Sequence, residues 1–108
     1  PPVSVAADAR VRIHRFDARH GKLIAFERNV DYQMSEDLKQ AGGNEALEKP
    51  VEVRATLAKP MHVYDLRELR YLGFTSQIQF KLDPWQPSLF AVTMDKRPVE
   101  TLIADMTN

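Results

Sequence analysis

Histidines are the side chains best suited to carry protons near neutral pH, and this chain has three of them: His14, His20 and His62. None has the spacing of a metal site, such as two histidines four residues apart on one helix face. The chain has no cysteine, which excludes disulfides, thiol catalysis and thiolate metal sites. Its serines lack the Gly-x-Ser-x-Gly nucleophile elbow. We therefore expect no catalytic residue, no cofactor and no metal, and we predict that the chain is not an enzyme.

A group of basic residues surrounds the first predicted strand, and it consists of Arg10, Arg12, Arg15 and Arg19. With His14 and Phe16 among them, these arginines could bind phosphate or RNA. The other interpretation is structural, because charged side chains on an edge strand discourage pairing with other chains. Nearby acidic residues favour the structural interpretation, but Arg12 and Arg15 stay candidates for partner contact.

Aromatic residues supply the other candidates for partner contact. Trp85 lies between Pro84 and Pro87, and it either anchors a partner or folds back over one end of the core. Tyr64 and Tyr71 fall together on a predicted helix, slightly off its apolar stripe. The two tyrosines are likewise candidates for rim or interface residues, with packing against the core as the alternative.

Length and composition describe one ordinary globular domain. The chain has 108 residues, of which 44% are hydrophobic and 28% are charged, and its 15 basic and 15 acidic residues give no net charge. A neutral chain is unsuited to nonspecific nucleic-acid binding, which needs a basic surface. Apolar runs are too short to span a bilayer. Because the sequence opens on Pro1-Pro2 without Met, we expect a fragment or a processed product.

The first half is predicted to form a β-hairpin followed by a linker. Val11 to Phe16 and Lys22 to Val30 are β-prone runs on either side of a turn, in which Gly21 would supply a positive φ. Ser35 to Gln40 suggests a short helix, and the polar stretch from Ala41 to Pro50 suggests a mobile connection. We therefore separate residues 1–50 from a second unit, residues 51–108.

The second half predicts the order strand, helix, strand, strand, helix. Alternation indicates strands over 51–57, 77–82 and 89–94, the first ended by Lys59-Pro60. Val63, Leu66, Leu69 and Leu72 recur near helical spacing, with Gly73 as a stop. Pro98 opens a final helix whose apolar stripe is formed by Val99, Leu102, Ile103 and Met106.

This half resembles the short N-terminal domain of secretins and of TonB-dependent signal transducers, which is related to small domains of other secretion-system components. The matching segments are VEVRATL, VYDLRELRYLGF, QIQFKLDP and SLFAVTMDKRPVETLIADM, in which Gly73, Asp83-Pro84 and Pro98-Val99 occupy the expected places. The family usually has a glycine where this chain has Trp85 to Ser88. The resemblance implies a periplasmic domain that packs against neighbouring subunits or receives a partner protein.

We therefore predict an α+β domain, a small mixed sheet with two helices on one face, preceded by a β-hairpin unit. The expected function is a non-catalytic structural or protein-docking domain of a bacterial envelope secretion or transport assembly. Its partners would be protein subunits, self-association included, and not nucleic acid or membrane. We expect a periplasmic location, although a cytoplasmic one is also open. The alternatives are a small ligand-binding or regulatory domain that uses the Arg/His stripe, and an RNA-binding module.

Overall fold

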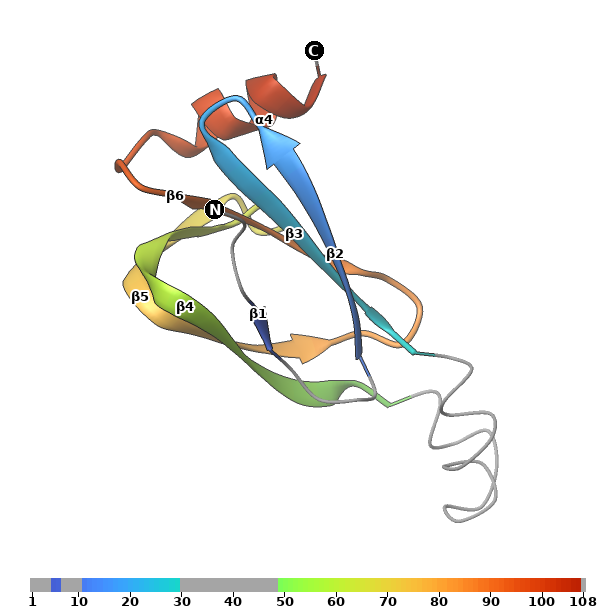
Figure 1. The fold of residues 1–108 in the computed structure, drawn as a ribbon. Helices are drawn as coiled ribbons and strands as arrows, with labels where there is room; N and C mark the ends of the chain where they lie inside the picture. The colour runs from blue at the N-terminus through green and yellow to red at the C-terminus, as the bar shows by residue number, and fades with distance from the viewer. Residues whose placement is uncertain (1–4, 7–10, 30–48, 108) are drawn as a thin grey trace.

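The structure is a computed structural model, and it describes residues 5–6, 11–29 and 49–107. Its elements are β1 (Val5–Ala6), β2 (Val11–Ala18), β3 (Gly21–Arg28), β4 (Val51–Asp65), β5 (Arg70–Leu82), β6 (Ser88–Thr93) and α4 (Val99–Thr107). The strands form one six-stranded sheet in the order β1-β4-β6-β3-β2, and β5 pairs with β4. Figure 1 shows β4 and β5 curving together beneath the layer of β2, β3 and β6.

The predicted fold class is wrong. Every strand pairing in the described residues is antiparallel, so the sheet is not mixed. The described residues contain one helix, α4, where two helices on one face were expected. The fold is mostly β, and strands from both halves of the chain share its sheet, since β3 pairs with β6 and β1 pairs with β4.

The region around Tyr64 was predicted to form a helix. It forms instead the end of β4, a turn and the start of β5. The spacing of Val63, Leu66 and Leu72 imitates a helix because β4 is covered on both faces here, so that Val63 and its neighbour Tyr64 are both buried. Gly73 does not stop a helix. It has φ 112° and lies at a register shift between β4 and β5.

Pro60 does not end its strand as predicted, because β4 continues through it to Asp65. The register between β4 and β5 shifts between Thr56 and Met61, so the proline occupies an irregularity where no regular ladder bond is needed from it. This irregularity divides β4 into two parts with different neighbours. The first part pairs with β1, and the second part pairs with β6.

The β2–β3 hairpin is present as predicted, but Gly21 has a different role. Gly21 lies in β3, outside the positive-φ region, and a Cβ there would overlap the carbonyl oxygen of Val92 on β6. Near the turn, Lys22 donates a hydrogen bond to Asp17. This hydrogen bond and the charge of Lys22 lower the pKa of Asp17, so the small stabilisation it contributes is lost as the pH falls below that carboxyl's usual range.

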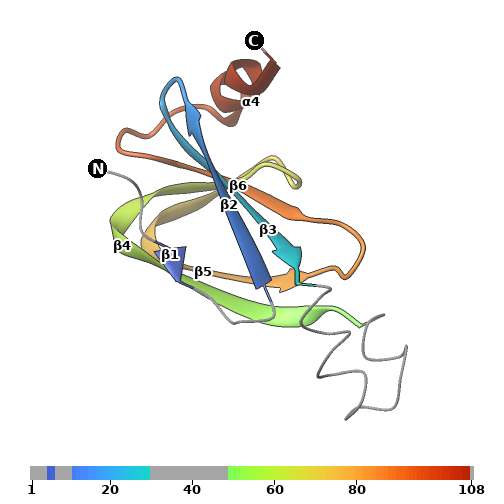
Figure 2. The ribbon, with the colours of Figure 1, turned by 45° about the vertical axis from the view of Figure 1, so that its right-hand side comes forward.

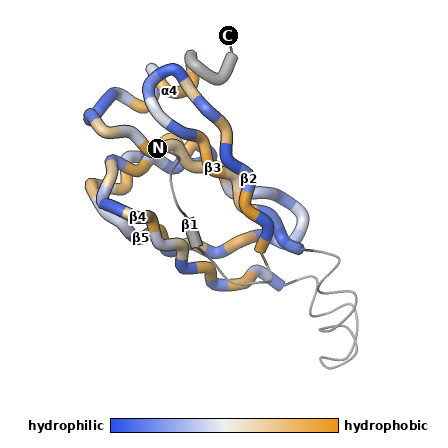
Figure 3. Tube along the Cα trace, viewed as in Figure 1, coloured by the Kyte–Doolittle hydropathy of each residue, from blue (hydrophilic) through white to orange (hydrophobic). Residues whose placement is uncertain are grey.

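The inner face of the sheet carries the main core. Three phenylalanine rings lie at its centre, with centroids 4.9 Å apart for Phe26–Phe80 and Phe80–Phe90 and 5.8 Å apart for Phe26–Phe90. Alternate residues of both parts of β4 surround them, and Figure 3 shows this alternation of hydrophobic and hydrophilic residues along the strands. Because the three rings come from β3, β5 and β6, they hold the two layers together.

The end of the outer face around Tyr64 and Ala91 is covered by α4, which begins directly after Pro98 as the sequence predicts. Leu102 packs against Tyr64 and Ala91, and Leu23 and Ile103 extend this second cluster. Figure 2 shows the helix at the same end of the molecule as the β2–β3 turn. The predicted helix at 35–40, and all of the predicted connection except its last two residues, lie outside the described residues.

Replacing Gly73 with alanine tests the positive φ of this residue at the register shift between β4 and β5. An L-residue at φ 112° is strained although no neighbour crowds a Cβ there, so we expect the free energy of unfolding to fall by about 1–3 kcal/mol. Urea denaturation measures this, with Ser76→Ala in the same strand as the control. An unchanged stability of Gly73→Ala would contradict the backbone described here.

Candidate functional site

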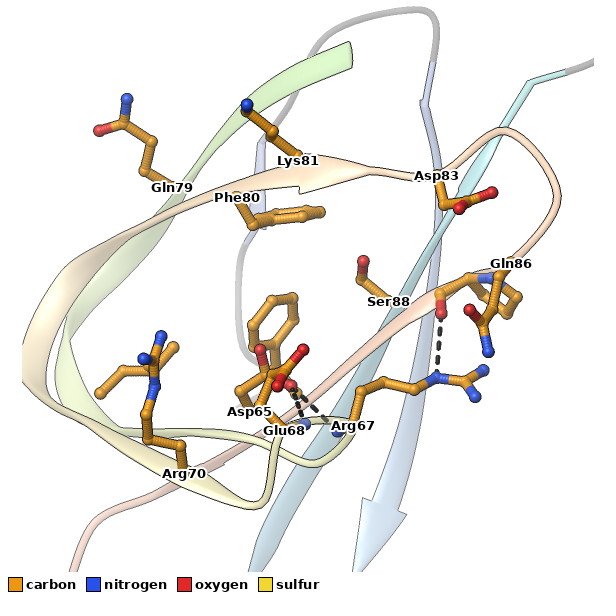
Figure 4. Close-up of a pocket in the computed structure, with 13 residues that line it drawn as sticks. Asp65, Arg67, Glu68, Arg70, Gln79, Phe80, Lys81, Asp83, Gln86 and Ser88 are labelled. Carbon is orange, nitrogen blue, oxygen red and sulfur yellow. Dashed lines mark hydrogen bonds between the residues drawn. The ribbon is translucent and has the colours of Figure 1, made fainter. Parts of the chain in front are cut away.

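A pocket of about 520 Å³ opens between β5 and the loops at either end of it. One wall is the turn after β4, which carries Arg67 and Glu68, and another is the loop between β5 and β6, which carries Asp83 and Gln86. Figure 4 shows these side chains around a central space with the Phe80 ring pointing into it. Its volume is that of ordinary ligand or side-chain binding sites.

Hydrogen bonds fix the two loops. One carboxylate oxygen of Asp65 accepts the backbone N–H groups of Arg67 and Glu68, at 2.9 and 3.0 Å, which is the turn that aspartate favours. Asp83 accepts the N–H of Trp85 at 2.8 Å in the same way. The side chain of Arg67 joins the loops, because its Nε donates to the carbonyl oxygen of Pro87 at 3.1 Å.

The wall formed by β5 is apolar inside and polar outside. Phe80 faces the pocket, and Phe90 and Leu72 also line it. Gln79 and Lys81 line the pocket too, yet Figure 4 shows that their side chains point away from it. The β5 wall of the pocket near these residues therefore consists of the main chain of β5 and the side chain of Phe80.

The rim carries groups of both charges. Among the described residues, the side chains of Glu68, Arg70, Gln86 and Ser88 make no hydrogen bond or ion pair, so they are available to a partner. Carboxylates beside arginines suit neither an isolated anion nor an isolated cation. Such a rim presents hydrogen-bond donors and acceptors of both charges side by side.

The edge of β5 next to the pocket is open. In the part of the chain that the structure describes, β5 pairs with β4 alone, and its ten residues from Tyr71 to Phe80 (YLGFTSQIQF) carry no charge. The other edge strand, β2, is protected differently, because charged residues (Arg12, Arg15 and Asp17) occupy three of its eight positions. Edge strands normally avoid pairing through such charges, and the open part of β5 lacks them.

Two exposed apolar side chains lie on the loops beside this pocket. Trp85 is 74% exposed in the β5–β6 loop, and Leu69 is 57% exposed in the turn before β5. Leu69 has φ 55°, a conformation that is uncommon for a leucine. Of the two interpretations of Trp85, this exposure contradicts a side chain that covers the core, and the partner anchor stays a prediction.

The two tyrosines lie elsewhere. Tyr64 is fully buried beneath α4, where its hydroxyl accepts the backbone N–H of Arg97 at 2.7 Å. Tyr71 is half-buried beside it, hydrogen-bonded to His62 at 2.8 Å and covered by Lys96, whose Nζ lies 4.6 Å from the ring centroid. Neither tyrosine lines the pocket.

The predicted arginines do not join this site either, because β2 and β5 are opposite edge strands. Arg12 and Arg15 differ by an odd number of positions on β2 and so belong to opposite faces. Both interact with other residues, and His14 pairs with Glu27 at 2.8 Å. Arg10 lies outside the described residues. The arginines of the described part of β2, Arg12 and Arg15, therefore do not form one basic surface.

Comparison of the chain with protein-family models, with curated proteins and with solved structures finds no significant match. Within residues 5–6, 11–29 and 49–107, no three histidine, aspartate or glutamate residues are grouped so that they could hold a metal ion. The described residues also include no helix long and apolar enough to cross a membrane.

The sequence reasoning identified Trp85 but missed the pocket and the β5 edge. The residues around Asp65 were assigned to a helix, which hid the turn that forms one wall. Two signals in the sequence were available. Aspartate favours turns because its carboxylate accepts backbone N–H groups two or three residues later, and a ten-residue uncharged run next to strand-like alternation is unusual for a strand at an edge.

Replacing Asp65 with alanine tests how the pocket wall is held. The variant loses the acceptor for two backbone N–H groups, so we expect the free energy of unfolding to fall by about 1–2 kcal/mol in urea denaturation. Asp65→Asn keeps an acceptor oxygen and serves as the control. Equal stability of the alanine variant and the wild type would mean that these bonds do not hold the turn.

Proposed function

We propose that this chain is a non-catalytic protein-docking domain, which binds a partner across the open edge of β5 and the two loops beside it. The observation that carries the proposal is the edge of β5 that no other described strand pairs with, because an open strand offers unpaired N–H and C=O groups to an added strand. Strand addition needs no catalytic group, and it takes its specificity from pockets that receive alternate side chains.

The second half of β5, where its pairing with β4 is regular, supports this proposal more than the first half does. From Gln77 to Leu82, β5 pairs with β4 in an unbroken register, whereas register shifts interrupt the pairing on the side of Gly73. Irregular strands are poor templates for pairing, and regular ones are good templates. The docking segment is therefore residues 77–82, of which Gln79, Phe80 and Lys81 line the pocket.

The pocket and the exposed apolar residues support the same surface. A strand added at residues 77–82 would direct alternate side chains toward the inner face, where the pocket has an apolar wall and a polar rim. Trp85 and Leu69 would then contact the partner at the two loops. Exposed aromatic residues next to a concave surface are typical of interaction sites.

The bacterial envelope assembly is a further part of the proposal, and it depends on the sequence resemblance alone. The helix-containing order that the resemblance implied is absent from this fold, so the docking role is argued from the surface of β5 instead. A periplasmic location has the same basis as the assembly.

A ligand-binding or RNA-binding role for the arginine and histidine residues of β2 has less support. Arg12, Arg15 and His14 all interact with other residues of the chain, and the two arginines belong to opposite faces. A phosphate or RNA site needs several basic groups directed at one place.

Truncating Trp85 tests the docking role. We expect Trp85→Ala to retain its stability within about 0.5 kcal/mol, because the side chain is exposed, and to weaken partner association about tenfold or more. The immobilised full chain would be used to retain proteins from an extract of the source cells, with each protein quantified by mass spectrometry. The matched control is Phe16→Ala, an equally apolar truncation of a half-exposed residue on the opposite edge strand.

A specific partner lost by Trp85→Ala and kept by Phe16→Ala supports the proposal. Equal retention by both variants and the wild type would overturn docking at this surface. If Trp85→Ala fails to fold, Leu69→Ala provides the same comparison from the other loop.

A further inference from the structure

The sequence of the docking segment is complementary to itself. Gln77, Gln79 and Lys81 belong to the outer face of β5, and Ile78 and Phe80 belong to the core-facing side. In an antiparallel pair, directly opposite residues share a face. A two-fold axis through Gln79 therefore places polar residues opposite polar ones and apolar residues opposite apolar ones.

We infer that the β5 edge pairs with the same edge of a second copy of this chain, antiparallel and centred on Gln79. This inference rests on the proposed docking function and identifies its partner. In this register Ile78 lies opposite the partner's Phe80, and pairs of β-branched and aromatic residues stabilise antiparallel sheets. The two-fold arrangement makes the contact closed, so it yields a dimer and not a fibre.

The charges permit this pairing. Lys81 is the one charged residue from Gln77 to Leu82, and in this register it lies opposite the partner's Gln77, away from the partner's Lys81. Like charges directly opposite one another destabilise a strand pair, and none arises here. The edge strand β2 is less suited to pairing with a second copy of itself, because it carries three charged residues, Arg12, Arg15 and Asp17.

The register is set by where β5 is regular. A two-fold axis at Gln79 pairs residues 77–81 of each copy, all within the unbroken register with β4. An axis at Ile78 would extend the pairing back toward Phe74, into the region of register shifts. An axis at Phe80 would bring Asp83 of the β5–β6 loop into the ladder, outside the strand. Gln79 is thus the centre that uses most of the regular segment.

The pocket gives the pairing a further contact. The core-facing side chains of the added strand, Ile78 and Phe80 of the partner subunit, would lie toward the mouth of the pocket. Because the contact is two-fold, each copy would cover the other's pocket mouth in the same way. This would remove apolar surface from water on both copies.

The absence of cysteine from the chain makes disulfide formation a direct test. Single cysteines are introduced into the full chain as Gln79→Cys, Gln77→Cys and Lys81→Cys, with Ala104→Cys on the exposed side of α4 as the control. In a glutathione buffer, two thiols are oxidised to one disulfide while oxidised glutathione is reduced to two thiols. Circular dichroism checks that every variant is folded.

We expect Gln79→Cys to form covalent dimers at least about tenfold faster than Ala104→Cys, because directly opposite positions lie within disulfide reach. Gln77→Cys and Lys81→Cys should each crosslink slowly alone, since four residues of offset separate identical positions by roughly 13 Å. A mixture of the two should crosslink rapidly. Fast self-crosslinking of Gln77→Cys would overturn the register, and control-level rates for all three variants would overturn self-pairing.

Light scattering keeps the inference testable without cysteine. The mass of the wild type should rise toward a dimer with concentration, and Gln79→Lys should weaken this association at least about tenfold by placing two lysines opposite each other. Ala104→Lys adds the same charge elsewhere and should dimerise as the wild type does. A wild type that stays monomeric overturns self-pairing, whereas loss of a foreign partner on Trp85→Ala would still support docking.

Discussion

The irregularity of β4 between Thr56 and Met61 is the constraint on which the rest of this structure depends. It allows one long strand to serve two layers, since the part before it pairs with β1 and the part after it pairs with β6. Because β5 follows β4 through the bend, the hairpin curves over the phenylalanine rings of β3 and β6. A straight β4 would leave Phe80 far from Phe26 and Phe90 and would leave no concave side on β5.

The same bend explains why the proposed docking surface lies at one end of β5. Curvature brings the turn after β4 and the loop after β5 toward each other, and Arg67 joins them through its bond to the Pro87 carbonyl oxygen. The pocket is enclosed by these two loops and by the inward face of Phe80. The outer face of the sheet has a packing role instead, because α4 covers Tyr64 and the neighbouring residues of β6 there. In the described part of the chain, α4 thus packs on the outer face around Tyr64, while the edge of β5 has no strand paired with it.

Much of the sheet could be predicted from the sequence, because alternation is a local signal. The β2–β3 hairpin, the strands around Val53, Ile78 and Phe90, and the helix after Pro98 are all present. The segment around Tyr64 could not be assigned in the same way. Alternation disappears where both faces of a strand are covered, and the covering helix is distant in the sequence. The continuation of β4 after Pro60 was not predicted, because a proline interrupts a regular ladder. It is tolerated here because the strand is irregular at that point.

The candidate site was less predictable than the fold. Trp85 could be selected from its place between two prolines, but the sequence left open whether it anchors a partner or covers the core, and only the second is contradicted by its exposure. Tyr64 and Tyr71 were selected from a helical geometry that the chain does not have, so they lie in or beside the second core cluster. The open edge of β5 depends on which strands become neighbours. That is a property of the whole topology, which the sequence of β5 does not contain.

Amide hydrogen exchange of the full chain, compared between dilute and concentrated solutions, shows directly whether the β5 edge is open and whether it pairs with a second copy. In dilute solution we expect some amides of Gln77 to Leu82 to exchange much faster than those of the paired strands β4 and β6. At high concentration these amides should become protected, while the amides of α4 keep their rates. Slow exchange along this segment at every concentration would mean that its edge is already covered. Fast exchange at every concentration would mean that the edge is open but does not pair with a second copy.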